Sequence, residues 1–171
     1  MKEVEHFLAP WSATPKRVVR KMLELAEIKP GETLYDLGCG DGRVLIEASK
    51  RYKIESVGIE CQEKLARESG KNARKNGLEN LVTIVEGDVF GQDLSGADIV
   101  FTYLTDPGMN MLKDKLSAEL KDDARIVSHY YTFKNVKPKS QHFIWGWQLW
   151  FPPRLPMPQY VALYEGKSLR V

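Results

Sequence analysis

Hydrophobic residues near the start of the chain recur with the spacing of an amphipathic helix. They lie three and four positions apart, at Val18, Val19, Met22, Leu23 and Ala26. This spacing predicts a helix over residues 15–28, with Thr14 as its N-cap and Pro15 in the first helical position. The segment Lys29-Pro30-Gly31 is expected to end this helix.

A regular alternation of predicted strands and helices follows. Short apolar runs predict strands over residues 33–37, 56–60, 81–86, 98–104 and 124–131. Helical spacing predicts helices over residues 42–52 and 62–76, with Gly77 just beyond the second, and a further helix along Met109, Leu112, Leu116 and Leu120. Strands that alternate with helices imply right-handed crossovers, so we expect a doubly wound, mostly parallel, Rossmann-like α/β sheet.

The C-terminal part of the chain breaks this alternation. Apolar side chains alternate along one face at Phe143, Trp145, Trp147, Leu149 and Phe151, and again at Tyr160, Ala162 and Tyr164. Between the two runs lie four prolines that predict an extended loop: Pro152, Pro153, Pro156 and Pro158. We expect the two runs to form an antiparallel strand pair that completes a seven-stranded sheet.

The tryptophans of this C-terminal part allow two interpretations. Because one face of the first run holds most of its bulk, we expect Trp145, Trp147 and Trp150 to pack against a helix. The alternative is that they line a groove for an extended peptide. Neither interpretation alters the fold expected for the chain.

Composition places the chain among ordinary globular proteins. A length of 171 residues, 43% apolar and 28% charged, is that of a single domain over residues 1–171. The net charge of +2 is too weak to argue for nucleic acid by itself. The two cysteines have neither metal-binding nor disulfide spacing, so we expect no metal site. We find no secretory signal and no apolar run long enough to span a bilayer, and therefore expect a cytoplasmic protein.

The most informative segment is residues 35–42, YDLGCGDG, where the first strand gives way to the next helix. Glycines there let the backbone approach a ligand, and the helix start offers unpaired N–H groups. A nicotinamide dinucleotide would require G-x-G-x-x-G, but the spacing here is G-x-G-x-G with Asp36 and Asp41 beside it. These carboxylates would repel a pyrophosphate and attract the ammonium and sulfonium of S-adenosylmethionine (SAM).

Two further acidic residues follow the next two strands. Glu60 lies 24 residues after Asp36, about the separation expected of a carboxylate that accepts from both ribose hydroxyls. Asp88 follows the third strand, where it can accept from the adenine amino group while the Val89 N–H meets a ring nitrogen. Three carboxylates at successive strand ends, with the glycine loop in register, indicate a SAM site.

This pattern resembles the class I SAM-dependent methyltransferases, with residues 36–42 as motif I, Glu60 as motif II and Asp88 as motif III. Within that class it resembles the small archaeal protein-lysine methyltransferases and their mitochondrial relatives. The shared segments are TP with VV and ML in residues 14–23, YDLGCGDGR, VGIE, MLKDKL and RIVSH. The chain departs from that pattern at Ala13, where a proline is usual, at Trp11 and at Tyr130-Tyr131.

The resemblance implies a methyltransferase that uses SAM to methylate surface lysines of protein substrates. We also expect a monomer. It implies that the cofactor contacts Trp11, Thr14, Asp36, Gly38, Cys39, Gly40, Glu60, Cys61, Asp88 and Val89. The candidates for shaping the acceptor channel are Tyr103, Ser128, His129 and Tyr130. For His129 a buried core role is an equal alternative. No general base is identified, because desolvation and the neighbouring sulfonium can both lower the pKa of a substrate lysine.

Three other functions stay open. A nucleic-acid methyltransferase is suggested by residues 105–108, TDPG, which share only part of the Asn/Asp-Pro-Pro-aromatic box of enzymes that methylate base amino groups. A small-molecule acceptor would require a closed pocket in place of an open groove. A non-catalytic SAM-binding module is disfavoured because such a relic would not need the full set of acidic residues.

Overall fold

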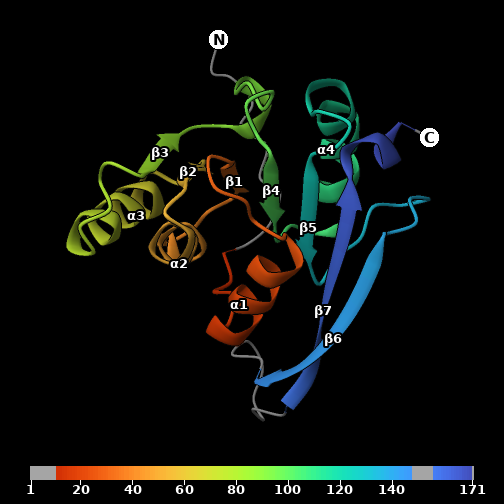
Figure 1. Ribbon diagram of the computed structural model, residues 1–171, viewed down its shortest axis with the longest axis horizontal. Helices are drawn as coiled ribbons and strands as arrows, with labels where there is room; N and C mark the ends of the chain where they lie inside the picture. The colour runs from red at the N-terminus through yellow and green to blue at the C-terminus, as the bar shows by residue number, and fades with distance from the viewer. Residues whose placement is uncertain (1–10, 148–155, 171) are drawn as a thin grey trace.

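The computed structural model describes residues 11–147 and 156–170 and contains one seven-stranded sheet (Figure 1). Its strand order is β3-β2-β1-β4-β5-β7-β6, in which β7 is antiparallel to both neighbours and the other pairs are parallel. The strands are β1 (Thr33–Leu37), β2 (Glu55–Glu60), β3 (Val82–Glu86), β4 (Ile99–Thr102), β5 (Arg125–His129), β6 (Ser140–Trp147) and β7 (Pro156–Glu165). The predicted mostly parallel sheet with an antiparallel C-terminal pair is confirmed.

Helices cover both faces of the sheet, as expected of a doubly wound fold. They are α1 (Lys16–Leu25), α2 (Arg43–Tyr52), α3 (Glu63–Lys75) and α4 (Asp106–Glu119), with short 3-10 helices η1 (Val89–Gly91) and η2 (Gly166–Leu169). One core cluster joins α1, α2 and α3 to one sheet face, and a second joins α4 to the other. Alternate residues of β4 enter different clusters: Ile99 and Phe101 the first, and Val100 the second.

Most predicted elements lie within three residues of their observed bounds. Gly77 follows the C-cap of α3 with a φ of 65°, as its predicted position requires. The start of α1 was predicted wrongly. Pro15, and not Thr14, is the N-cap, and no side chain caps this helix. The Thr14 hydroxyl instead lies 3.5 Å from Nδ1 of His129, so tertiary packing draws it away from the helix end. The helix also ends at Leu25, before the predicted Lys29-Pro30-Gly31 stop.

Two predictions for the C-terminal strand pair were also wrong. Pro156 and Pro158 belong to β7 and not to a loop. Proline has no backbone N–H to donate to a neighbouring strand. It fits there because β7 pairs with β5 only from Val161 onward, so the first residues of β7 have a partner strand on one side only. Trp145 does not pack against a helix: it is 63% exposed, on the same side of β6 as the exposed Phe143. Trp150, Pro152 and Pro153 lie outside the described residues, as does the Trp147 side chain.

Candidate functional site

A cleft lies where the strand order reverses, between β1 and β4, at the carboxyl ends of the parallel strands. Open α/β sheets bind ligands at such a switch point. The cleft encloses about 900 Å³ of empty space, including space open to solvent. The residues that line the cleft include all ten of the predicted cofactor contacts: Trp11, Thr14, Asp36, Gly38, Cys39, Gly40, Glu60, Cys61, Asp88 and Val89.

The glycine loop between β1 and α2 adopts backbone conformations that other residues rarely take. Gly38, Gly40 and Gly42 have φ angles of 81°, 56° and 78°. A Cβ on Gly40 would collide with Nε1 of Trp11, and one on Gly42 would collide with Oγ of Ser69. These two glycines therefore let the residues before α1, on one side, and α3, on the other, approach the loop closely.

Glu60 ends β2 and is held by backbone donors at the floor of the cleft. Its Oε2 accepts from the N–H of Gly40 and its Oε1 from the N–H of Gln62, both at 2.9 Å. Only 4% of the residue is exposed. Because each carboxylate oxygen has two lone-pair directions, these bonds fix the side chain and leave acceptor capacity toward the cleft.

Asp36 is the second buried carboxylate, at the end of β1. Burial is the main cause that raises its pKa to about 7, and the nearby charges of Glu60 and Asp41 add to the shift. Among the described residues no donor forms a hydrogen bond or ion pair with its carboxylate. A buried carboxyl group of this kind favours a cation beside it, since a cation would offset the cost of ionisation.

The remaining predicted contacts line the opposite wall and the loop. Asp88 precedes η1, and its Oδ1 accepts from the N–H of Phe90 at 3.0 Å, which positions it at the start of that short helix. Val89 is buried beside it. Cys39 is 5% exposed, and burial raises the pKa of its thiol, so it remains a neutral packing group. The Cys61 thiol lies 3.8 Å from Oε1 of Glu60.

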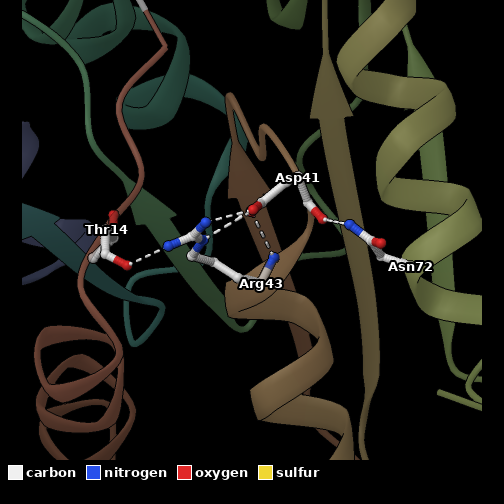
Figure 2. A network of polar contacts seen from close by, with 4 residues as sticks. All are labelled: Thr14, Asp41, Arg43 and Asn72. Atoms are coloured by element: carbon white, nitrogen blue, oxygen red, sulfur yellow. Dashed lines mark hydrogen bonds and ion pairs between the residues drawn. The ribbon is translucent and has the colours of Figure 1, made fainter. Parts of the chain in front are cut away.

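Asp41 does not present a free carboxylate to the cleft, which corrects the electrostatic argument made for it from the sequence. Arg43 holds it through Nε, at 2.9 Å, and Nη2, at 2.5 Å (Figure 2). Nη1 of the same arginine donates to the carbonyl of Thr14 at 3.2 Å, and Asn72 donates to the Asp41 carbonyl at 3.0 Å. This network ties the residues before α1 and the helix α3 to the glycine loop. Sequence reasoning missed it, although an acidic residue two positions before an arginine was visible.

Of the four predicted acceptor-channel residues, only Tyr103 is part of the cleft lining. His129 is 1% exposed beneath it, with their ring centroids 4.1 Å apart, and Ser128 is fully buried. The Nε2 atom of His129 lies 3.0 Å from Oε1 of Gln159, and burial lowers the pKa of the histidine to about 4. The imidazole is therefore neutral near pH 7 and acts as a fixed part of the core. Tyr130 follows β5 with a φ of 71°, and its ring is half-buried.

The segment TDPG that suggested a nucleic-acid enzyme forms the start of α4. Thr105 is the N-cap, its hydroxyl accepts from the N–H of Gly108, and Pro107 lies in the first turn. Threonine and proline at these positions are explained by helix capping. Within residues 11–147 and 156–170, no three metal-binding side chains come together as a metal site. No helix in the same ranges is long and apolar enough to cross a membrane.

Several known proteins are similar to this chain in sequence or structure. Residues 36–140 match the family model of the ANTKMT methyltransferase domain. The chain is 41% identical to a protein-lysine N-methyltransferase of Saccharolobus islandicus, over 77% of this chain and 82% of that protein. It is 29% identical to the adenine nucleotide translocase lysine N-methyltransferase of Mus musculus, over 75% of this chain and 56% of the mouse protein.

A solved structure of an RNA methyltransferase from Salinibacter ruber, in complex with S-adenosyl-L-homocysteine, is also similar. It superposes with a TM-score of 0.82 at 32% identity, covering 90% of this chain and 93% of that one. The family match and the high coverage of the Saccharolobus relative agree with the glycine loop and the acidic strand ends described above. The chain therefore belongs to the family of the ANTKMT methyltransferase domain and is a SAM-dependent methyltransferase.

Proposed function

We propose that this protein transfers a methyl group from SAM to the side-chain amine of lysine in protein substrates. The observation that carries the proposal is the 41% identity to a protein-lysine N-methyltransferase across 82% of that protein. The mouse relative, which is named for lysine methylation of a protein, supports the same acceptor.

The residues of the cleft fit SAM, which supplies an electrophilic methyl group on a sulfonium. Asp36 offers a buried carboxylate with no cation beside it among the described residues, as a cationic ligand requires. Glu60 is oriented by two backbone donors and keeps acceptor capacity for two ribose hydroxyls. Gly40 leaves room where any Cβ would collide with Trp11, so the loop backbone can approach the ligand closely.

We assign the adenine end of the site to the residues after β3. Asp88 would accept from the adenine amino group, and the N–H of Val89 would donate to a ring nitrogen. Cys61, beside Glu60, would lie along the nucleoside, and Gly38 along the methionine part. Trp11 and Thr14, held near the loop through Arg43, would close the site over the bound molecule.

A substrate lysine must lose its proton before it can attack the methyl group. At pH 7 this costs about 4.6 kcal/mol for a lysine of ordinary pKa. His129 cannot serve as the base, because its buried imidazole has a pKa of about 4 and is not part of the cleft lining. We propose that the chain works by desolvating the amine and aligning it, so that the proton passes to solvent.

The similarity to the Salinibacter enzyme favours RNA as the second candidate acceptor. Labelled SAM incubated with cell extract and purified protein distinguishes the two. Protein-lysine methylation predicts label that survives RNase, is released by protease, and is recovered as Nε-methyl-lysine after acid hydrolysis. The Asp36→Ala variant serves as the control that should transfer no label. Label lost on RNase treatment alone would overturn the lysine assignment.

The remaining expectations from the sequence stay proposals. We propose a cytoplasmic protein, which is supported by two free cysteines, Cys39 and Cys61. We also propose that residues 1–171 form one domain and act as a monomer. Size-exclusion chromatography with light scattering tests the monomer, since a mass near 39 kDa, about twice the 19.5 kDa of the chain, would contradict it.

A further inference from the structure

The hairpin of β6 and β7 extends the sheet past the carboxyl ends of its parallel strands. β7 pairs with β5 only as far as Val161, opposite His129, whereas β6 and β7 stay paired as far as Trp147 and Pro156. The outer part of the hairpin therefore lies beyond the same edge of the sheet that carries the cofactor cleft (Figure 1). A protein substrate that brings a lysine to the cleft must approach this edge.

β6 is an edge strand without the usual protection against pairing. It pairs with β7 on one side, and among the described residues no other strand pairs with it. Backbone N–H and C=O groups on its other side therefore point away from the sheet. Edge strands usually carry charged residues or proline, which discourage the addition of another strand. The eight residues of β6, SQHFIWGW, contain no lysine, arginine, aspartate, glutamate or proline.

Exposed aromatic side chains lie along one face of the outer hairpin. Phe143 and Trp145 are 70% and 63% exposed, and their partners in register on β7, Tyr160 and Pro158, lie on the same face. Phe143 contacts Tyr160, with ring centroids 5.4 Å apart. Ile144 points to the opposite face, where it packs against the core cluster that includes α1. We call the four residues of the exposed face, Phe143, Trp145, Pro158 and Tyr160, the hairpin patch.

The sequence around the hairpin patch lacks acidic residues. No aspartate or glutamate lies between Asp123 and Glu165, although the chain has 23 of them. The same stretch includes Lys134 and Lys137, both exposed in the connection from β5 to β6. A partner segment with neutral or acidic side chains can therefore approach this side of the molecule without charge repulsion.

From these observations we infer that β6 binds an extended segment of the protein substrate as an added strand of the sheet. The inference rests on the proposed methylation of proteins and names the surface that holds them. Backbone hydrogen bonds to the edge of β6 supply affinity, and apolar side chains of the segment pack on the hairpin patch. Because every sequence has backbone donors and acceptors, docking of this kind demands little of the sequence around the lysine.

The unpaired edge favours a peptide over the other partners that an aromatic, acid-free surface can attract. A lipid surface would accept the aromatic rings but would leave the edge N–H and C=O groups of β6 without partners. A single-stranded nucleic acid would stack on the rings, and that contact makes no use of the edge. An added peptide strand uses both the rings and the edge.

A lysine-free peptide of alternating valine and glutamate tests the docking strand separately from methyl transfer. Fluorescence anisotropy of the labelled peptide should show binding to the wild-type protein and about tenfold weaker binding to Trp145→Ala. Met111→Ala, which removes another exposed apolar side chain on α4, is the matched control and should leave the affinity unchanged.

Backbone N-methylation of the same peptide tests the edge of β6. Methylating the amides of the valines blocks one edge of the peptide strand, and methylating those of the glutamates blocks the other. One of these two versions should bind at least about tenfold more weakly than the parent peptide, and the other should bind as the parent does.

Methyl transfer to this peptide extended by one lysine gives a kinetic readout. Trp145→Ala should raise KM about tenfold with kcat unchanged, because the hairpin patch binds the segment equally before and during the reaction. Calorimetry should show the same SAM affinity in Trp145→Ala as in the wild type, which confirms that the variant is folded.

Four results would overturn the inference: peptide affinity undiminished in Trp145→Ala, both N-methylated versions binding as the parent does, poly(U) RNA binding at the patch where the peptide does not, or a dimer of the wild type that Trp145→Ala dissociates. Peptide binding that depends on Trp145, without any methyl transfer to lysine, would uphold the docking strand and refute only the lysine acceptor.

Discussion

Replacing Asp36 with asparagine should stabilise the ligand-free protein in a pH-dependent way. The folded pKa of this carboxyl group is about 7, above the ordinary value near 3.9 that it has in the unfolded chain. As the pH rises from 4 to 7 the unfolded state releases this proton while the folded state keeps it, so the free energy of unfolding falls. Three pKa units correspond to a loss of about 4 kcal/mol, complete above pH 7.

The asparagine in Asp36→Asn cannot ionise, so the variant should not show this fall in the free energy of unfolding as the pH rises. Urea unfolding without SAM should show the variant and the wild type close in stability at pH 4. At pH 8 the variant should be more stable, by up to about 4 kcal/mol, less the cost of any unpaired amide donor. Equal free energies of unfolding at both pH values, or a variant less stable at pH 8, would refute the assignment of a buried, unpaired carboxylate.

The same titration should govern SAM binding to the wild type. If the ionised Asp36 faces the cation, the affinity for SAM should rise about tenfold per pH unit between pH 5 and 7, with release of a proton on binding. Calorimetry in buffers of different ionisation enthalpy measures that proton. A pH-independent affinity over this range would show that Asp36 does not face the ligand.

Three further substitutions test the parts that hold the site. Gly40→Ala places a Cβ against Nε1 of Trp11, so the indole must move, and calorimetry should show SAM affinity at least about tenfold weaker. Arg43→Met removes the ion pair at the start of α2 and the bond to the preceding segment. Its unfolding free energy should fall by about 1–2 kcal/mol, and Arg43→Lys should restore only part of it. Arg125→Met leaves Glu32 and two carbonyls after α1 without their largely buried partner. Urea unfolding should therefore show a free energy of unfolding lower by about 3 kcal/mol, and an unchanged unfolding midpoint would contradict this.

The sheet could be predicted from the sequence because its signals are local. Apolar runs bounded by turn residues marked β1 to β5, alternating apolar side chains marked most of β6 and β7, and the spacing of Met109, Leu112 and Leu116 marked the helix α4. The acidic strand ends could be placed together because parallel strands share one carboxyl edge. Asp36 and Glu60, in β1 and β2, and Asp88, just after β3, could therefore be assigned to one cleft from the sequence alone.

What could not be predicted depends on contacts between segments distant in the sequence. Thr14 has the residue type and position of an N-cap, but its hydroxyl lies against His129, 115 residues away. Trp145 has the pattern of a buried strand residue, yet only the position of β6 at the sheet edge determines that it is exposed. The neutralisation of Asp41 by Arg43 depends on side-chain direction at the helix start, which the spacing leaves open.

The carboxylate of Glu60 provides the most direct test of the SAM site. Its neighbour in register on β3 is Glu86, which is exposed, so Glu60→Gln and Glu86→Gln make the same chemical change in different surroundings. Calorimetry should show wild-type protein binding SAM but not NAD, a loss of about tenfold to a hundredfold for Glu60→Gln, and little change for Glu86→Gln. Tight binding of NAD, or undiminished SAM affinity in Glu60→Gln, would contradict a cleft built by acidic strand ends for a cationic nucleoside.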